Sequence, residues 1–159
     1  MKYKRFEDLP VWQDAIELAV LIYELTAKPA FRRRYSLRDQ LERAAVSISN
    51  NITEGFERGT TPELLTFLYI SKGSAGETRS VLCLTERLRD FLDLKSEILN
   101  LKLRSQKISR QLQGWCTSLQ NSDIRGQRYL TQKSQRQSKE SREREEFLKE
   151  LEEIKARNS

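Results

Sequence analysis

The chain lacks histidine altogether, and its 159 residues include only two cysteines, six glycines and three prolines. Without histidine it has no side chain of the type that most often acts as a general base or metal ligand. Cys83 and Cys116 have no CxxC spacing, so we expect free, buried thiols in a reducing compartment and no zinc site. The phosphate-cradling motifs GxxxxGK[ST] and GxGxxG are also missing. These absences predict a protein without catalysis, cofactor or metal.

Long hydrophobic runs are missing as well. No apolar stretch approaches the roughly 18 residues of a membrane span. Residues 1–10 are basic but carry no hydrophobic segment of the kind found in secretory signals. We therefore expect a cytoplasmic protein with no membrane partner.

Apolar residues recur at intervals of three and four along most of the chain, which predicts helices. The scarcity of glycine and proline favours long helices over many strands and turns. Helices are expected at about 10–28, 36–59, 62–92 and 94–119. The last follows a heptad seam that only Ser105 interrupts; the seam consists of Leu94, Ile98, Leu101, Ile108, Leu112, Trp115 and Leu119. The predicted fold is all-α, an antiparallel up-down four-helix bundle in residues 1–121, followed by a charged C-terminal extension, helical or disordered, in residues 122–159.

Capping residues locate the expected helix ends. Asp8 can cap the first helix, and Ser36 the second. Gly55 and Gly59 are expected at the end of the second helix, in the left-handed conformation. Thr60 or its neighbour is expected to cap the third helix, ahead of a proline in the first turn.

A polar ridge runs along the second helix beside its apolar stripe, at steps of three and four residues. This row is interpreted either as a hydrogen-bond network that fixes helix register or as a binding edge. We expect Gly73 in the third helix to pack closely against the small Ala44-Ala45 pair. Glu77 and Lys72 then meet the ridge, whose residues are Gln40, Arg43, Ser47, Asn51 and Glu54.

Two carboxylates, Glu54 and Glu77, are candidates for an acid–base pair. We expect them instead to accept hydrogen bonds from Arg43 or Lys72. An enzyme is therefore disfavoured.

The net charge of +6 and the pI near 9.4 point toward an anionic partner, although simple solubility explains them equally well. One basic cluster lies on the fourth helix, with no acid between residues 98 and 114; it consists of Lys102, Arg104, Lys107 and Arg110. A second is a loop flanked by Phe31 and Tyr35, interpreted either as a phosphate-holding and base-stacking segment or as a solvated turn; it consists of Arg32, Arg33 and Arg34. A third lies in the extension, either a tethered arm or plain disorder; it includes Arg125, Arg128 and Arg136.

The first and third predicted helices carry apolar residues on more than one side. An extra apolar face on a small domain usually contacts a partner. We therefore expect a homo-oligomer.

The chain resembles a known family of four-helix bundles over residues 4–119. The resemblance rests on Phe6, Leu9 and Val11-Trp12, on Gln40-x-x-Arg43-Ala44-Ala45-x-Ser47-Ile48, on Asn51-Ile52-x-Glu54-Gly55 and on Gly73-Ser74-x-x-Glu77. The chain departs from the pattern at Thr53, Ser71-Lys72 and Gly76. This family comprises proteins encoded within intervening sequences of bacterial large-subunit ribosomal RNA genes, and a related branch is the accessory variability determinant of diversity-generating retroelements.

The resemblance implies a homopentamer whose positive surface binds nucleic acid, and in the retroelement branch it implies assistance to a reverse transcriptase. Our leading hypothesis is a non-catalytic oligomer that binds structured RNA, alone or alongside a reverse transcriptase. The alternative is a protein–protein interaction adaptor that does not bind nucleic acid directly.

Overall fold

The computed structural model describes residues 3–121, 144, 147 and 148. The chain divides into two compact units, Met1–Gly126 and Gln127–Ser159. The first contains four long helices, α1 (Pro10–Thr26), α2 (Tyr35–Glu57), α3 (Thr61–Arg87) and α4 (Lys95–Gln120), and three short 3₁₀ helices, η1 (Phe6–Asp8), η2 (Pro29–Phe31) and η3 (Arg89–Leu94). No strand occurs among the described residues, which confirms the all-α prediction.

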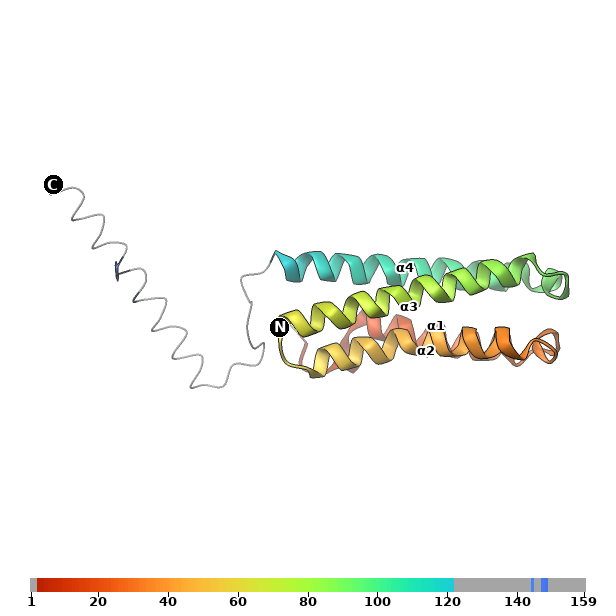
Figure 1. Ribbon diagram of the computed structural model, residues 1–159, viewed down its shortest axis with the longest axis horizontal. Coiled ribbons are helices and arrows are strands. Elements are labelled where there is room, and N and C mark those ends of the chain that lie inside the picture. The colour runs from red at the N-terminus through yellow and green to blue at the C-terminus, as the bar shows by residue number, and fades with distance from the viewer. Residues whose placement is uncertain (1–2, 122–143, 145–146, 149–159) are drawn as a thin grey trace. The chain divides into compact units, whose positions relative to one another are not determined.

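The four long helices form an up-down bundle, as predicted. Each packs against its neighbours in sequence, and α4 also packs against α1 (Figure 1). The α1–α2 connection, which contains η2, and the α3–α4 connection, which contains η3, lie at the same end of the bundle. In the described part of the chain, none of the helices has the length and apolarity needed to cross a bilayer.

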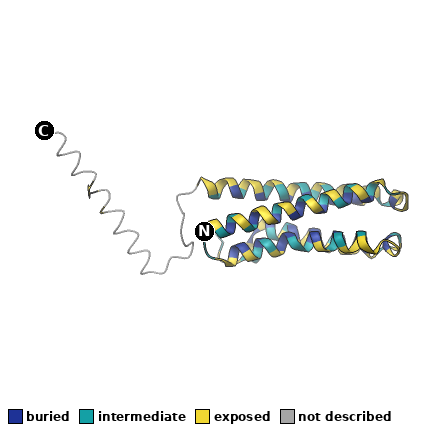
Figure 2. Cartoon of the chain, viewed as in Figure 1, coloured by how far each residue is buried: buried dark blue, intermediate teal, exposed yellow. Residues whose placement is uncertain are grey.

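The apolar stripe of each helix faces the bundle interior (Figure 2). The heptad seam predicted along α4 is buried at Ile98, Leu101, Ile108 and Leu112. Its polar interruption, Ser105, is also buried, and its hydroxyl donates a hydrogen bond of 2.6 Å to the carbonyl of Ala75 in α3. The seam therefore keeps its register because its one polar group is satisfied.

The close contact between α2 and α3 is made by Gly55 and not by Gly73. A Cβ atom placed on Gly55 would lie 2.8 Å from the Cβ of Phe67 and 3.2 Å from Cδ1 of Leu64. Gly73 is exposed, and a Cβ placed there meets no atom within 4 Å. The prediction that Gly73 packs against Ala44-Ala45 is wrong, because the helix turns Ser74 and Ala75 inward instead.

Several helix ends differ from those expected. The N-cap residues of α1 and α2 are Leu9 and Arg34, neither of which makes a side-chain cap, so the caps predicted at Asp8 and Ser36 are wrong. Gly59 does adopt the expected left-handed conformation, with φ of +80°, where glycine carries no steric cost. The cap of α3 is confirmed, because the Thr60 hydroxyl accepts the backbone N–H of Glu63.

The boundary expected between a bundle in residues 1–121 and an extension in residues 122–159 stays a prediction. Arg125, Arg128 and Arg136 lie outside the described residues.

Candidate nucleic-acid interface

Three contacts hold the α1–α2 connection against the α3–α4 connection and the first turn of α4. The rings of Phe31 and Phe91 are buried and pack with centroids 4.6 Å apart. Arg34 forms a salt bridge of 2.7 Å with Asp90, and one of 2.6 Å joins Lys28 to Glu97. Residues far apart in sequence are thereby held on one surface, which we call the cationic end and define by Arg32, Arg33, Arg34, Arg87, Arg89 and Lys95.

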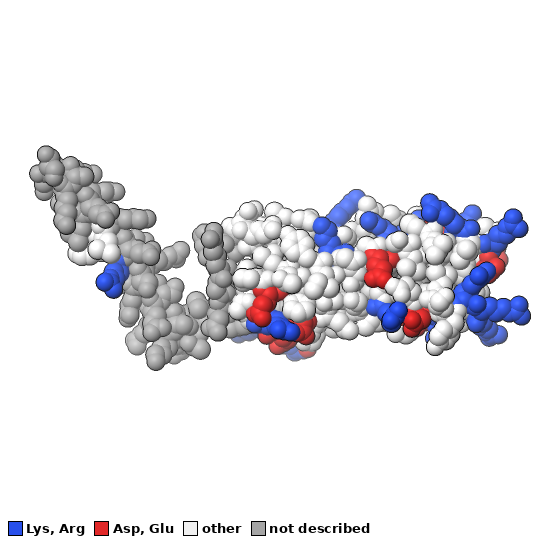
Figure 3. All heavy atoms as spheres, viewed as in Figure 1, with Lys and Arg blue, Asp and Glu red and all other residues white. Residues whose placement is uncertain are grey.

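Positive charge exceeds negative charge at this end. Residues 28–38 and 86–97 together carry eight Lys and Arg but four Asp and Glu. Figure 3 shows blue side chains gathered over the end of the bundle where the two connections lie. Three of the four acids, Glu86, Asp90 and Glu97, already form salt bridges with Lys102, Arg34 and Lys28.

Four arginines and one lysine at this end are consequently left without a salt bridge within the described residues. All five are exposed: Arg32, Arg33, Arg87, Arg89 and Lys95. Arg87 and Lys95 contribute a weaker, longer-range field, which helps to lower the pKa of Glu86. Guanidinium groups without partners on a fixed scaffold suit bidentate contact with phosphate.

The basic cluster on α4 is mostly neutralised by neighbouring helices. Lys102 forms a salt bridge of 2.7 Å with Glu86 of α3, whereas Arg104 and Lys107 form salt bridges of 2.9 Å with Glu17 and Asp14 of α1. Three of the four cations are therefore paired, and the surface around α4 is not purely positive. Residues 98–114 contain no acid, and the acids that pair with these cations lie on the helices packed on either side of α4.

Arg110 is the exception on α4. It is exposed and has no salt bridge in the part of the chain that the structure describes. Of the four predicted α4 cations, only this one is available to an anion without first giving up an acidic partner.

The salt bridges between α4 and its neighbouring helices also lower the pKa values of two acids, Glu86 and Asp14. The hydrogen bond from Lys102 lowers the pKa of Glu86 below its usual 4.5. Burial of Asp14 would raise its pKa, but hydrogen bonds from Lys107 and Gln111 outweigh burial and lower it below 3.8. Both acids therefore stay ionised near neutral pH and hold their lysines in place.

The polar ridge of α2 forms two hydrogen-bonded groups. In the first, Arg43 donates to the Gln40 side-chain oxygen at 2.9 Å, and the Gln40 amide donates to Glu77 of α3. In the second, the hydroxyls of Ser47 and Ser74 lie 2.9 Å apart, and Asn51 donates to the Ser47 carbonyl at 2.7 Å. The contacts connect α2 to α3 and fit the interpretation of a network that fixes register.

Glu54 and Glu77 have different partners from those expected. Glu54 pairs with Arg58, at 2.6 Å, near the end of α2, and Lys72 donates to Gln113 of α4 instead of to an acid. Over the described residues, no group of three or more Cys, Asp and Glu is placed to hold a metal ion.

The two cysteines differ in their surroundings. Both are free, and Cys116 is buried, which raises the pKa of its thiol. Cys83 is only half-buried, so the expectation that both thiols are buried is wrong for this residue.

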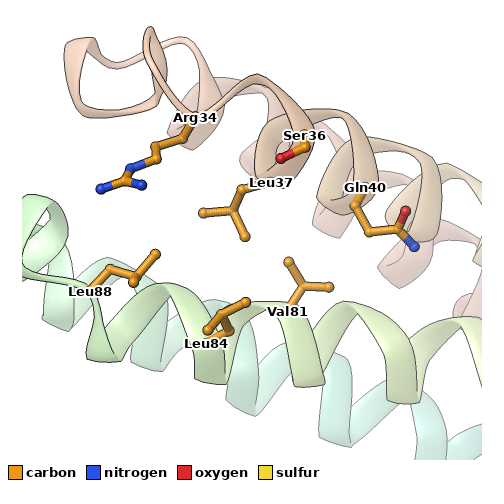
Figure 4. A pocket seen from close by; sticks show the side chains of 7 residues that line it. All are labelled: Arg34, Ser36, Leu37, Gln40, Val81, Leu84 and Leu88. Carbon is orange, nitrogen blue, oxygen red and sulfur yellow. The ribbon is translucent and has the colours of Figure 1, made fainter.

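Two apolar surfaces face solvent. A groove of about 400 Å³ lies between α2 and α3, with an apolar floor made by Leu37, Val81, Leu84 and Leu88 and polar side chains along it from Arg34, Ser36 and Gln40 (Figure 4). On α1, Ile16, Val20 and Tyr23 form an exposed apolar strip.

Sequence reasoning found the arginines of the first connection and missed the cations in and beside the third connection, Arg87, Arg89 and Lys95. The sequence did contain a signal that could have identified them. In an up-down bundle the first and third connections lie at the same end, so their charges should have been considered together.

Comparison with known proteins supports the resemblance seen in the sequence. The family model described as 23S rRNA-intervening sequence protein matches residues 7–114, which is most of the bundle. A search of curated proteins gave no match.

Proposed function

The chain belongs to the family of 23S rRNA-intervening sequence proteins, and from that premise we propose that it is a non-catalytic protein that binds RNA through its cationic end. The observation that carries the proposal is that three arginines of the two connections, Arg32, Arg33 and Arg89, are exposed and form no salt bridge with any acid that the structure describes. They lie on two connections that aromatic packing and salt bridges hold together. The family name, which refers to ribosomal RNA, agrees with an RNA partner.

Binding of this kind should depend on phosphate more than on base sequence. Each arginine that contacts a phosphate releases bound counterions, so affinity falls as salt rises. Three such contacts on a single strand give a slope of log affinity against log salt of about −2. Arg110 and the tail arginines, Arg125, Arg128 and Arg136, stay predicted as further contacts.

The test is a fluorescence-anisotropy titration of labelled RNA over a range of salt concentrations. We expect the double variant Arg32→Glu/Arg33→Glu to weaken binding at low salt by at least tenfold and to flatten the salt slope. The matched control is Lys4→Glu/Arg5→Glu, which makes the same charge change on two exposed residues at the other end of α1. No binding by the wild-type protein at low salt, or an equal loss in both variants, would contradict the proposal.

Self-association is the second part of the proposal. The exposed strip on α1 and the α2–α3 groove are apolar surfaces that a second copy can cover. Several copies would place several cationic ends on one particle and raise the affinity for a long RNA by multivalency. The pentamer comes from the resemblance and stays a prediction, and light scattering with and without RNA measures the subunit number.

A protein-interaction adaptor is the alternative function, and the α2–α3 groove favours it. An apolar floor with polar edges suits the apolar face of a partner's helix. The RNA titration separates the two functions, since an adaptor gives no binding at low salt.

The partner implied by the resemblance is a reverse transcriptase, and we keep this partner as a prediction that co-purification with such an enzyme can test. A cytoplasmic location also stays a prediction. The variants Glu54→Gln and Glu77→Gln test the proposal that the protein is non-catalytic. Each substitution should change only the free energy of unfolding.

A further inference from the structure

The two aromatic residues that flank the arginine run have opposite environments. Phe31 is 1% exposed and packs on Phe91, so it holds the two connections together and is not available to a ligand. Tyr35 is 78% exposed, the highest value among the large apolar side chains described. An aromatic ring this exposed to water contributes little hydrophobic stabilisation to the core.

Tyr35 is nevertheless attached to a rigid element. It is the first residue of α2, and the first turn of that helix is closed by the hydrogen bond from the Arg38 backbone N–H to the Arg34 carbonyl, at 3.0 Å. The ring therefore projects from a fixed backbone position beside Arg32 and Arg33. A tyrosine side chain has only two χ angles, so it loses little conformational entropy when a planar ligand stacks on it.

The arginine side chains around Tyr35 outnumber the carboxylates. Arg38, Asp39 and Glu42 line a small hollow with the tyrosine. Glu42 accepts a hydrogen bond of 2.8 Å from Arg38, and Asp39 pairs with Arg43 at 3.2 Å. Both acids thus form salt bridges with arginines, whereas Arg32 and Arg33 have no acidic partner among residues 3–121.

We propose that the cationic end binds unpaired RNA, with a base stacked on Tyr35 and the adjoining phosphates on Arg32 and Arg33. The inference rests on the proposed function and adds the class of RNA to it. Phosphate contacts alone do not distinguish single strands from duplexes, whereas stacking on an aromatic side chain requires a base whose face is uncovered. Duplex bases are covered by their neighbours, so they cannot use Tyr35.

The test compares a short oligouridylate with an RNA duplex of the same number of phosphates. Removal of one stacking aromatic should weaken binding of the oligouridylate by about tenfold in Tyr35→Leu, with no change for the duplex. Tyr35→Phe keeps the ring and should bind the oligouridylate as the wild-type protein does. Tyr69→Leu is the matched control, because Tyr69 is another exposed tyrosine, on α3, and its loss should change neither affinity.

Helicity measured by circular dichroism should be the same in all variants, because the Tyr35 side chain is not part of the core. The inference is overturned if Tyr35→Leu binds the oligouridylate as tightly as the wild-type protein, or if both probes lose affinity equally. In either case, continued sensitivity to Arg32→Glu/Arg33→Glu would leave the proposed RNA binding intact. If the wild-type protein binds neither probe, the proposed function fails together with the inference.

Discussion

Phe31 and Phe91, sixty positions apart in the sequence, stack at an interplanar angle of 57° with ring centroids 4.6 Å apart. The pair is fully buried at the end of the bundle, between the α1–α2 and α3–α4 connections. It brings an arginine-rich segment with no acids next to a second segment that adds Arg89. The packing of two apolar rings therefore determines where the positive charge of this protein collects.

Replacement of Phe91 by alanine should destabilise the bundle by about 3–5 kcal/mol, because it removes a buried ring and leaves a cavity beside Phe31. Urea unfolding followed by circular dichroism measures the loss. The adjacent Leu92 is exposed, so Leu92→Ala should change stability by no more than about 0.5 kcal/mol. Equal effects of the two substitutions would show that the aromatic pair does not hold the connections together.

Glycine-to-alanine substitutions should have opposite effects at two positions in the bundle. Gly55→Ala should destabilise it by about 1–3 kcal/mol, because the new Cβ would lie 2.8 Å from Phe67 Cβ and 3.3 Å from the Leu64 carbonyl oxygen. Gly73→Ala should stabilise it by about 0.5–1 kcal/mol, since alanine is the better helix former and the position is open. Thermal unfolding of both variants measures the difference, and a stabilising Gly55→Ala would contradict the close helix contact.

Charge reversal on α4 should affect stability at one cation and leave it unchanged at another. Lys107→Glu replaces the partner of Asp14 with a like charge, so the loss should be about 1 kcal/mol. Arg110→Glu breaks no salt bridge and should leave the free energy of unfolding within about 0.5 kcal/mol of the wild-type value. A weaker RNA affinity in Arg110→Glu is consequently interpretable as a lost phosphate contact, whereas in Lys107→Glu it is not.

The bundle should lose stability in acid partly through Asp14. Its pKa in the folded protein lies below the ordinary 3.8, so the ionised form contributes stability above that value and the contribution is lost as pH falls through the lower, folded pKa. Asp14→Asn should therefore reduce the decline in urea midpoint below about pH 4. Part of the decline in urea midpoint should remain in this variant. The pKa of Glu86 is lowered as well, so the Lys102–Glu86 pair also loses its stabilising contribution in acid.

Val20 offers a test of self-association. This side chain is exposed in the middle of the apolar strip on α1, and Val20→Glu places a charge there without disturbing the core. If the strip is an interface between copies, the variant should have a lower mass by light scattering at the same protein concentration. Ser80→Glu, an exposed change on α3, is the control. An unchanged mass in Val20→Glu would show that another surface is used.

Much of the fold could be predicted from the sequence because helix periodicity is a local property. The intervals between apolar residues identified four helices and placed the α4 seam, including Ser105, on the correct face. Helix ends were less predictable, since a good capping residue such as Ser36 competes with the conformation that the preceding loop imposes. In the structure, η2 extends to Phe31 and α2 begins at Tyr35, so Ser36 is already inside the helix.

The candidate site was predicted only in part. Arg32, Arg33 and Arg34 are adjacent in the sequence and were identified together, but Arg89 joins them only through tertiary contacts such as the packing of Phe31 on Phe91 and the salt bridge of Arg34 with Asp90. The α4 cluster was over-interpreted for the same reason, because Glu86, Glu17 and Asp14 belong to other helices. Charge along one helix does not give the charge of a surface when neighbouring helices contribute to that surface.

The sequence by itself determined the helices, the apolar stripes and the excess of positive charge, because each depends on residue types and short spacings. Only the tertiary structure decided which cations keep an acidic partner and which do not. The physical reason is that salt bridges form across distances of a few ångströms in space. Lys102, Arg104 and Lys107 therefore have acidic partners on adjacent helices, whereas Arg32, Arg33 and Arg89 lie at one end of the bundle and form no salt bridge in the part of the chain that the structure describes.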